Sequence, residues 1–520
     1  MQVTLGLHRA GLVSGRSPAV LDGTVKRTWI ETCARVARMG GGLRGIGAER
    51  GDRVAVLMLN GHRFLELYYA LPWIGALVMP INIRLTPKEI LEQLGDAEAK
   101  VLVVDDAFAR MLPALAGQMP SVRVIVHASD GPPPAGTVSL EELVRSGPAV
   151  EDVAASGDDI YGLFYTGGTT AASKGVMLTH ANIVANAYNC IAALEMRPDD
   201  IYLHAAPMFH MADSASTFGL TMYGAQHAFI PAFDVAKTLE AIQAFRVTTM
   251  LLVPTMINAV VHSPQIGGFD LSSLRRVTYG GSPMPTAVLE KALATLRCEF
   301  CQGYGMTETA PLLTCLPGRD HVAGGDAKQQ KRLRSAGLPV LNLDLRVLDV
   351  EGRQVPTGEV GEICARGANV MKGYWRRPEA TAEALRGGFM HTGDLGYLDE
   401  DGYVYLVDRA KDMIVSGAEN IYCVEVEAAL YAHPAVLEAA VFGVPHDEWG
   451  EQVHAVVVLK EGQSADPDLL IEHCKSRIAG YKCPKTLTLR QEALPKSGAG
   501  KILKRDLRAP FWQGQERQIH

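Results

Sequence analysis

The chain has 520 residues, a length that predicts two or more domains with a large buried core. Hydrophobic residues make up 48% of it and charged residues 21%, which is typical of a globular enzyme and excludes a disordered or fibrous protein. The formal net charge of −7 argues against a nucleic-acid binder.

The sequence carries no export signal or membrane span that we can identify. The N-terminus lacks a basic start followed by a long apolar run, so we expect no signal peptide. The longest apolar stretch, residues 68–80, is broken by Pro72 and Gly75 and is too short to cross a bilayer. Nine scattered cysteines without zinc-type spacing indicate reduced, mostly structural thiols. We therefore expect a cytoplasmic protein without a transmembrane segment.

Residues 1–27 give no usable signal, and from there helices and strands alternate. Thr86 is typical of a helix N-cap and Pro87 of a first helical position, so a helix is expected to begin there. The predicted helices are residues 28–43, 64–74 and 87–95, and the predicted strands are residues 53–58 and 101–104. This alternation predicts an α/β sheet.

The next stretch resembles a phosphate-binding loop in composition. An apolar run at residues 160–165 predicts a buried strand, and Thr179 predicts the N-cap of a helix near His180. Between them, residues 165–175 read Tyr-Thr-Gly-Gly-Thr-Thr-Ala-Ala-Ser-Lys-Gly. Small residues let backbone N–H groups approach a polyanion, and Lys174 supplies a charge suited to phosphate oxygens. The order Lys-Gly is not that of a Walker A sequence, and a flexible polar turn is the alternative reading.

In the middle of the chain, helices and strands again alternate, with predicted strands at residues 249–253 and 276–279. Gly280 and Gly281 follow the second strand, and ligands gather beyond strand carboxyl ends in open α/β sheets. A plain turn is the alternative there. A short basic segment, residues 328–334, is interpreted as a solvated loop that could attract the phosphates of a cofactor.

Residues 302–309, Gln-Gly-Tyr-Gly-Met-Thr-Glu-Thr, carry side chains suited to a nucleotide. Tyr304 can stack on adenine, and Thr307 can donate a hydrogen bond to phosphate. Glu308 is a hard oxygen ligand of the kind that Mg²⁺ prefers. Taken alone, Glu308 would more often be a surface carboxylate.

Five motifs resemble, in order, signatures of the adenylate-forming superfamily, which includes acyl- and aryl-CoA synthetases, luciferases and the adenylation domains of peptide synthetases. They are residues 165–175, 302–309, 391–396, 408–412 and 500–502. The resemblance covers roughly residues 28–508. The chain departs from the family pattern at Ala171 and Ala418, where the family usually has glycine.

The resemblance implies a nucleotide site and a catalytic set. Asp394 would accept hydrogen bonds from both ribose hydroxyls, Arg409 would reach the ribose or phosphate, and Glu308 would hold Mg²⁺. Lys501 would bridge the acid oxygen and the α-phosphate. The expected ATP- and AMP-binding residues are Thr166, Gly167, Gly168, Thr169, Thr170, Lys174, Tyr304, Asp394 and Arg409. The expected catalytic residues are Lys501, Glu308, Thr307 and His210.

The resemblance also implies an acid pocket. Residues 204–212 resemble the family segment that lines this pocket, with His210 against the reacting carboxylate; a core histidine is the alternative. The expected lining is His210, Met211, Ala212, Gly280, Gly281, Gly303, Gly305 and Met306. These small or adaptable residues favour an apolar acid, fatty or aromatic, over a charged diacid.

The implied architecture is an α/β fold of two domains. A large N-terminal domain, residues 1–410, would contain mixed and parallel sheets with helices and a β-rich subdomain, and would bind ATP and the acid. A small mobile α+β domain, residues 411–520, would follow the hinge Lys411. Gly417 and Ala418 would border the passage for CoA.

The function implied by the resemblance is that of an AMP-forming acid–CoA ligase that uses ATP, Mg²⁺ and CoA. Its partner would be a small carboxylic acid and not a nucleic acid, and the sequence leaves a homodimer open. One alternative is an enzyme that loads a carrier protein, and another is a luciferase-like relative. A third is a non-catalytic nucleotide-binding protein, against which Glu308, Asp394, Arg409 and Lys501 argue.

Overall fold

A computed structural model of the chain describes residues 1–166, 173–281, 284, 286–409, 412–416, 419–446, 449–497 and 502–513. The described chain forms two compact units. Unit 1 comprises Met1–Gly281, Lys291–Asp344 and Ala365–Met390. Unit 2 comprises Ser282–Glu290, Leu345–Cys364 and His391–His520. The domain boundary expected at Lys411 lies outside the described residues and stays a prediction.

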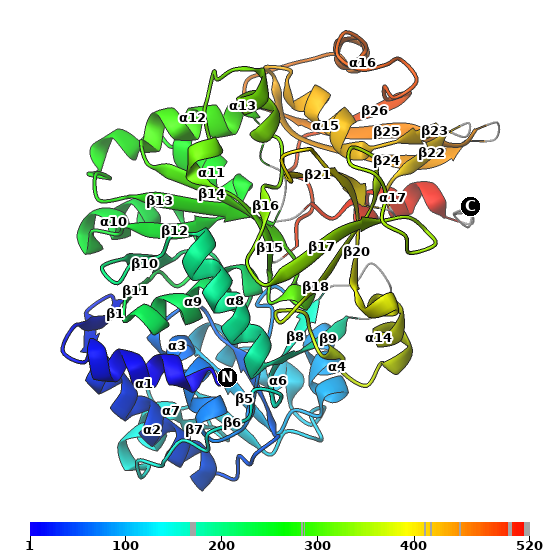
Figure 1. The fold of residues 1–520 in the computed structure, drawn as a ribbon. Coiled ribbons are helices and arrows are strands. Elements are labelled where there is room, and N and C mark those ends of the chain that lie inside the picture. The colour runs from blue at the N-terminus through cyan, green and yellow to red at the C-terminus, as the bar shows by residue number, and fades with distance from the viewer. Residues whose placement is uncertain are drawn as a thin grey trace. The chain divides into compact units, whose positions relative to one another are not determined.

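Sheet A of unit 1 is mostly parallel (Figure 1). Its strands are β1 (Pro18–Asp22), β2 (Val25–Thr28), β10 (Ile201–His204), β11 (Gln226–Phe229), β12 (Thr249–Leu252), β13 (Arg276–Gly280), β14 (Glu299–Gly305), β15 (Leu312–Leu316) and β16 (Leu338–Pro339). Their spatial order is β16-β15-β14-β13-β12-β10-β11-β1-β2. Because β10, β12, β13 and β14 run parallel, their carboxyl ends meet at one edge of the sheet.

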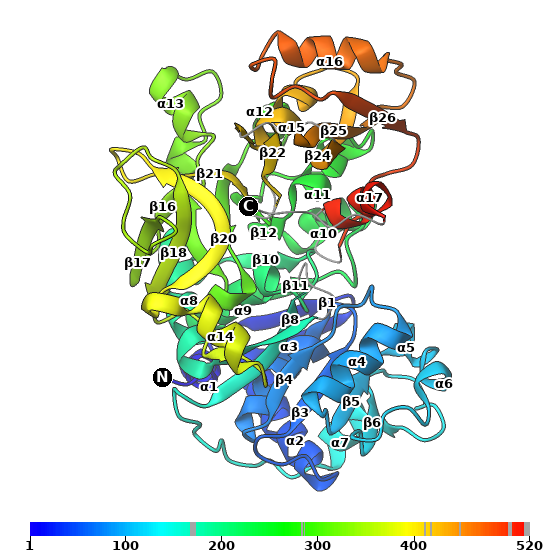
Figure 2. The same cartoon turned by 90° about the vertical axis from the view of Figure 1, so that its right-hand side faces the viewer.

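Sheet B of unit 1 also has a parallel centre. Its strands are β3 (Arg53–Leu57), β4 (Leu77–Pro80), β5 (Val101–Val104), β6 (Val124–His127), β7 (Val138–Ser139), β8 (Ile160–Thr166), β9 (Lys174–Thr179) and β19 (Gly373–Tyr374). Their order is β19-β9-β8-β4-β3-β5-β6-β7. Figure 2 shows β3, β4 and β8 side by side, and these strands are parallel. The carboxyl ends of β3 and β8 therefore lie at the same edge of sheet B.

Helices of unit 1 join the two sheets through a common core. The helices are α1 (Thr4–Val13), α2 (Trp29–Gly45), α3 (His62–Trp73), α4 (Pro87–Ala97), α5 (Asp106–Ala109), α6 (Leu112–Leu115), α7 (Leu140–Ser146), α8 (His180–Ala193), α9 (Met211–Tyr223), α10 (Val235–Phe245), α11 (Pro254–Val261), α13 (Ala327–Arg332) and α14 (Pro378–Ala384), with short 3₁₀ turns η1 (Ile266–Gly268), η2 (Thr307–Thr309), η3 (Gly318–Asp320) and η4 (Arg386–Gly388). α12 (Thr286–Leu296) has residues in both units. One buried cluster includes Val56 of β3, Tyr68 of α3, Tyr202 of β10 and Phe218 of α9, so both sheets share it.

Unit 2 contains most of sheet C and all of sheet D. Sheet C has β17 (Leu343–Leu348), β18 (Gly361–Gly367), β20 (Met390–Leu398) and β21 (Val404–Arg409), in that spatial order. Sheet D has β22 (Ile414–Ser416), β23 (Glu419–Ile421), β24 (Val436–His446), β25 (Gly450–Leu459) and β26 (Thr486–Arg490), with helices α15 (Cys423–Tyr431), α16 (Pro467–Lys475), α17 (Lys504–Arg508) and the turn η5 (Ala509–Trp512). α15 and α16 bury side chains in one core cluster of this sheet, and α17 contributes to another.

The fold therefore confirms the expected α/β class, with a β-rich part and a smaller α+β part. Helix starts follow the capping signals in the sequence. Thr28, Thr86 and Thr179 each cap a helix through a reciprocal pair of hydrogen bonds with the residue three positions later. Residues 1–27, for which no helix or strand was predicted, form α1, β1 and most of β2.

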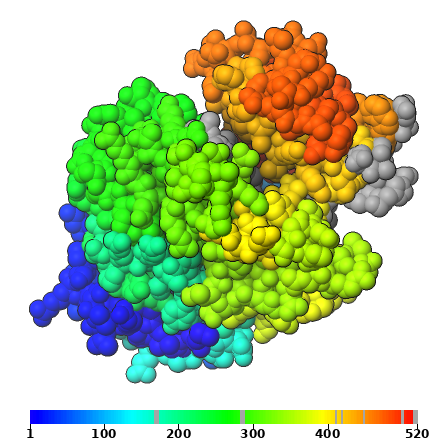
Figure 3. Space-filling model, turned by 45° about the horizontal axis from the view of Figure 1, so that its top comes forward, coloured from blue at the N-terminus to red at the C-terminus, as the bar shows by residue number. Residues whose placement is uncertain are grey.

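Two local expectations were wrong. Lys174 was expected in a loop, but it begins β9, which pairs antiparallel with β8. The segment is thus a β-hairpin, in which alternating apolar residues from Val176 onward complete the sheet. The basic segment 328–334 was expected as a loop, but most of it forms α13, which Asp326 caps through Gln329. Figure 3 shows α13 at the surface, where Lys328 and Lys331 are exposed. In the described part of the chain, no helix has both the length and the apolar character required to span a bilayer.

Candidate active site

Several expected site residues lie at the carboxyl edge of sheet A. β10 ends at His204, β13 at Gly280 and β14 at Gly305, and these strands run parallel. The segments that follow each strand therefore emerge at the same edge, which is where open α/β sheets bind ligands. The topology brings together the segment that carries His210, the paired glycines and the segment that carries Glu308.

His210 caps the helix that follows β10. Its Nδ1 accepts a hydrogen bond from the backbone N–H of Ala212, at 3.1 Å, and its ring is half-buried at the N-terminus of α9. The next residue, Met211, is only 1% exposed and belongs to the core cluster. His210 is therefore held by the helix terminus rather than buried in the core.

Glu308 is a buried carboxylate in the turn after β14. It is 6% exposed, and the Tyr374 hydroxyl donates to its Oε1 at 2.9 Å. The backbone N–H of Met371 donates to the Glu308 carbonyl at 2.8 Å. Burial, and then the charge of Glu308, raise the pKa of Tyr374 far above its usual value, so the hydroxyl stays a donor at neutral pH.

Lys174 completes a group that we call the Glu308 cluster: Glu308, Tyr374 and Lys174. The Lys174 ammonium lies 5.0 Å from the centre of the Tyr374 ring, within the range of a cation–π contact. Lys174 pairs with Thr166 across the β8–β9 hairpin, and Tyr374 pairs with Val176 on the other side of β9. The cluster therefore joins the outer strands of sheet B to the segment after β14 of sheet A.

Helix α4 makes hydrogen bonds to both ends of the β8–β9 connection. Asp96 accepts hydrogen bonds from the Tyr165 hydroxyl at 2.7 Å and from Arg377 at 2.6 Å. Gln93 donates to the Ser173 hydroxyl at 3.3 Å. Sequence reasoning assigned no role to Tyr374 or Asp96. The signal for Tyr374 was its place in the run Gly-Tyr-Trp at residues 373–375, whereas nothing in the sequence around Asp96 marked it.

Three more expected residues surround the turn η2. Tyr304 is half-buried on β14 opposite Thr314, and Thr307 opens the turn, with its carbonyl accepting from Ala310 at 3.1 Å. The backbone N–H of Met306 donates to the Pro311 carbonyl at 3.0 Å, and its side chain packs partly against the core. The backbone of η2 is thus fixed on both sides of Glu308.

At most of the positions where glycine is expected in the acid pocket, the backbone itself requires glycine, because of close contacts or a positive φ. A Cβ on Gly280 would lie 2.3 Å from the carbonyl oxygen of Gly303, and one on Gly305 would lie 1.8 Å from that of Pro311. Gly281 has φ +80°, which disfavours any other residue. A Cβ on Gly303 would meet the end of the flexible Leu312 side chain at 3.0 Å. Their role in acid binding stays a prediction.

Gly280 and Gly303 face each other across β13 and β14, so they form a matched pair for mutation. We expect Gly280→Ala to destabilise the protein by about 1–3 kcal/mol, because the strands must separate to admit the methyl group. Gly303→Ala should cost less, because only the Leu312 side chain must shift. The thermal unfolding midpoints of the two variants test this, and equal midpoints would contradict the strand-contact explanation.

In unit 2, Asp394 lies on β20, next to β18 in sheet C. Thr392 donates to the Ile363 carbonyl at 2.7 Å and accepts from the Asp394 N–H at 3.1 Å. Glu362 accepts from the Gly393 N–H at 2.9 Å. Asp394 pairs with Arg409 across β20 and β21, so these two expected nucleotide residues are neighbours in the sheet.

On β18 and β20, Glu362, Cys364 and His391 form the group of possible metal-binding side chains found among the described residues. The His391 Nδ1 lies 2.7 Å from the Glu362 carboxylate and 3.3 Å from the Cys364 sulfur. These are hydrogen-bond distances, and they explain the cluster as a side-chain link between β18 and β20, the strand that carries Asp394.

Helix α15 ties together the segments that flank the expected hinge and the expected catalytic lysine. The Cys423 N–H donates to the Asp408 carboxylate at 2.5 Å, before the hinge. One turn later the Glu427 carboxylate lies 2.8 Å from the ammonium of the partly buried Lys504, which follows the expected catalytic Lys501. Burial by itself would lower the pKa of Lys504, but Glu427, Cys423 and Asp408 together outweigh it and raise that pKa.

Some expected residues cannot be placed. Gly167, Gly168, Thr169, Thr170, Lys411, Gly417, Ala418 and Lys501, with the family departure Ala171, lie outside the described residues. Arg409 is described by its strand alone.

Comparisons with known proteins cover almost the whole chain. The family described as AMP-binding enzyme matches residues 7–375, and the AMP-binding enzyme C-terminal domain matches residues 425–501. A feruloyl-CoA synthase of Amycolatopsis sp is 41% identical over 510 residues, which is 97% of this chain and 98% of that protein. A fatty acid–[acyl-carrier-protein] ligase of Streptomyces coeruleorubidus is 35% identical and covers 97% of this chain and 95% of its own.

A solved structure has a closely similar fold. The crystal structure of an anthranilate CoA ligase in complex with anthranoyl-AMP superposes with a TM-score of 0.90 and 26% sequence identity. The superposition covers 98% of this chain and 97% of the other.

Proposed function

The chain belongs to the AMP-binding enzyme family and is an AMP-forming acid–CoA ligase, and on this premise we propose that its substrate is an aromatic carboxylic acid such as ferulate. The sequence alone left fatty and aromatic acids open. The observation that carries the proposal is the 41% identity, across 97% of the chain, to a feruloyl-CoA synthase.

In the first step, a carboxylate oxygen of the acid bonds to the α-phosphorus of ATP, and pyrophosphate leaves. Both reactants are anions, so the site must supply cations and hydrogen-bond donors. In this proposal Lys174 and Lys501 supply positive charge, residues 166–170 supply donors, and His210 lies against the acid. Thr307 donates to phosphate, and Tyr304 stacks on adenine.

Magnesium fits the Glu308 cluster in its chemistry. Mg²⁺ prefers oxygen ligands and is usually held by one or two carboxylates together with substrate phosphates. Glu308 offers a buried carboxylate whose position is fixed by Tyr374. A bound Mg²⁺ would neutralise phosphate charge at this point.

In the second step, the sulfur of CoA attacks the carbonyl carbon of the acyl-adenylate, AMP leaves, and the thiol loses its proton. Asp394 and Arg409 would hold the ribose and phosphate of AMP through both steps. Gly417 and Ala418 would border the passage through which the thiol arrives. The nine cysteines all carry free thiols, which supports the cytoplasmic location expected from the sequence.

The two steps need different residues of the C-terminal domain at one active site, so we propose a domain rotation about Lys411. A hinge of this kind absorbs a large change in φ and ψ. Proline fixes φ near −65°. Lys411→Pro should therefore trap one arrangement, with pyrophosphate release preserved and CoA-ester formation lost.

Lys411→Ala is the matched control for the hinge, because alanine removes the same side chain and leaves φ free. Both half-reactions are measured separately in each variant. Normal CoA-ester formation in Lys411→Pro would rule out the hinge at this position.

A panel of acids tests the substrate class. Pyrophosphate release is measured with ferulate, benzoate, octanoate and succinate at equal concentrations, and each product is identified by mass spectrometry. The proposal expects ferulate to have the largest kcat/KM. A preference for octanoate would contradict it. Parallel reactions with CoA and with an acyl carrier protein distinguish a CoA ligase from an enzyme that loads a carrier protein. The 35% identity to a fatty acid–[acyl-carrier-protein] ligase is the observation that favours this alternative.

A further inference from the structure

Asn60 connects the carboxyl edges of the two sheets. It follows β3 of sheet B, and its side-chain amide donates to the carbonyls of His204 at 3.1 Å and Ala206 at 2.9 Å. Its Oδ1 accepts from the backbone N–H of Met208 at 2.8 Å. One half-buried side chain therefore makes hydrogen bonds to the backbone of residues 204–208, which lead directly into His210.

Residues 204–208 are also held by a hydrogen bond from α3. The Tyr68 hydroxyl donates to the Met208 carbonyl at 2.5 Å, and Tyr68 is fully buried in α3. The backbone N–H of Asn60 also donates to the Pro231 carbonyl, beyond β11, at 2.9 Å. The path of the chain between β10 and α9 is thus set largely by groups on and just before α3.

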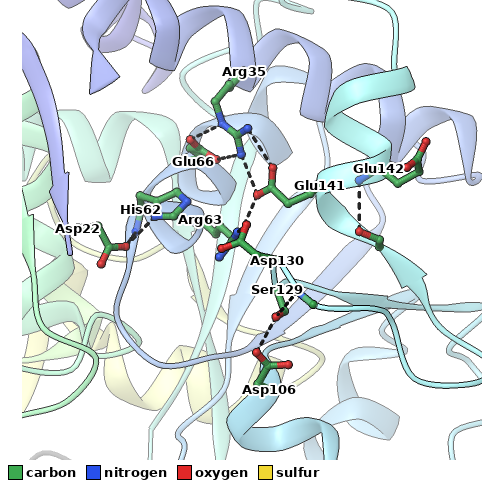
Figure 4. A network of polar contacts seen from close by, with 12 residues as sticks. Asp22, Arg35, His62, Arg63, Glu66, Asp106, Ser129, Asp130, Glu141 and Glu142 are labelled. Carbon is green, nitrogen blue, oxygen red and sulfur yellow. Dashed lines mark hydrogen bonds and ion pairs between the residues drawn. The ribbon is translucent and has the colours of Figure 1, made fainter. Parts of the chain in front are cut away.

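Asn60 is itself firmly anchored. On one side, the Leu59 N–H donates to the Asp105 carboxylate at 2.8 Å. On the other, the backbone N–H of His62 donates to Asp22 at 3.0 Å, and its ring Nδ1 lies 2.7 Å from the same oxygen. Figure 4 shows Asp22 and His62 at the start of α3.

The network in Figure 4 extends this anchor along α3. Arg35 forms a bidentate ion pair with the fully buried Glu66 and also donates to Glu141. Arg63 donates to the same Glu141 carboxylate at 2.7 Å. Burial would raise the pKa of Glu141, but hydrogen bonds from Arg35 and Arg63 outweigh it and hold the pKa at about 2. Glu141 is therefore ionised at neutral pH, and the first turns of α3 form a rigid support for Asn60.

We propose that Asn60 is the positioning residue for the acid: it sets the place of residues 204–208 and, through them, of His210. This inference rests on the proposed role of residues 204–212 in acid binding. Asn60 contacts neither the Glu308 cluster nor the hairpin of β8 and β9 through any hydrogen bond found among the described residues. Its removal should therefore affect the acid much more than ATP.

Asn182 offers a matched control, because it repeats the same bonding pattern elsewhere in unit 1. Its amide donates to the carbonyls of Ala368 and Val370, both at 2.8 Å, and its Oδ1 accepts from the Thr179 N–H at 2.9 Å. The segment that it holds leads to Met371, which bonds Glu308. Loss of Asn182 should therefore disturb the side of the site that binds ATP and metal.

The experiment compares Asn60→Ala with Asn182→Ala, each made in the full chain. KM for the preferred acid and KM for ATP are measured in both. Asn60→Ala should raise KM for the acid about tenfold, since displacement of a reacting group by about 1 Å can cost two orders of magnitude, and should leave KM for ATP within about twofold. Asn182→Ala should show the reverse pattern.

A second measurement stays informative if a variant folds poorly. The ratio of kcat/KM for two competing acids does not depend on how much enzyme is active. That ratio should change in Asn60→Ala and stay at the wild-type value in Asn182→Ala. Equal changes in acid and ATP constants with an unchanged acid ratio would overturn the proposal and leave Asn60 a purely structural residue. The test uses whichever acid the wild-type enzyme prefers, so it does not depend on that acid being aromatic.

Discussion

Replacing Lys501 by alanine is expected to lower the rate of acyl-adenylate formation by roughly 10²–10³-fold, the scale of losing one electrostatic partner of a transition state. The attacking carboxylate and the α-phosphate are both negative, and in this account the Lys501 ammonium bridges them. Thioester formation from supplied acyl-adenylate needs no such bridge and should be largely spared. Pyrophosphate release and CoA-ester formation are therefore measured as separate half-reactions.

The structure indicates that this variant should fold, because the chain on both sides of Lys501 is fixed by other groups. Lys496 pairs with Ile502 in a short antiparallel bridge and forms an ion pair with Glu438. Beyond the bridge, Lys504 forms a largely buried ion pair with Glu427, in which the two side chains are 18% and 15% exposed. None of these contacts involves the Lys501 side chain.

Lys475→Ala is the control, since Lys475 is an exposed lysine of the same unit that pairs with Glu472 at the surface of α16. Pairs of this kind contribute little to stability. Both half-reactions should be normal in that variant. Equal damage to the two half-reactions in Lys501→Ala would show that the lysine is not specific to adenylation.

The second large effect is expected from Glu308→Gln. Glutamine keeps the size of the side chain and can still accept from Tyr374, but it lacks the charge that would hold Mg²⁺. We expect adenylate formation to fall by roughly 10²–10³-fold. The Mg²⁺ concentration needed for half-maximal rate should rise, and a magnesium titration of pyrophosphate release measures it.

Tyr374→Phe separates the charge of Glu308 from its position. It removes the hydrogen bond to Glu308 but leaves the carboxylate and the aromatic ring near Lys174. One hydrogen bond to a charged group contributes about 1.5–3 kcal/mol, so the rate should fall by roughly ten- to a hundredfold, less than in Glu308→Gln. If Glu308→Gln had a normal magnesium dependence, Glu308 would not be the metal ligand.

Much of the fold was predictable because apolar runs and helix-capping residues in the sequence mark the strands and helices that the structure contains. Strand β5 and the starts of α4 and α8 lie where the sequence places them, since apolar runs and capping threonines act over a few residues. β9 was missed because its pairing partner, β8, lies across the phosphate-loop segment, and Lys174 looked like a loop residue. α1 was missed because its pattern of exposed and buried apolar residues is weak, with Leu12 exposed and Leu7 buried.

The candidate site was only partly predictable, for a different physical reason. Glu308 and Lys174 carry charges in recognisable motifs, so the sequence marked them. Asn60 and Asp96 act through hydrogen bonds to distant segments, and only the tertiary structure shows those partners. The small size of Gly280 and Gly305 suggested room for an acid, whereas the structure shows that close backbone contacts also require it.

The most direct test of the account follows the oxygen atoms of the acid. Ferulate labelled with ¹⁸O in both carboxylate positions is incubated with the enzyme, ATP, Mg²⁺ and CoA, and the AMP is examined by mass spectrometry. If a carboxylate oxygen bonds to the α-phosphorus and CoA then displaces AMP at the carbonyl carbon, each AMP formed carries one ¹⁸O and each feruloyl-CoA retains one. Unlabelled AMP, or label in pyrophosphate, would contradict an acyl-adenylate intermediate.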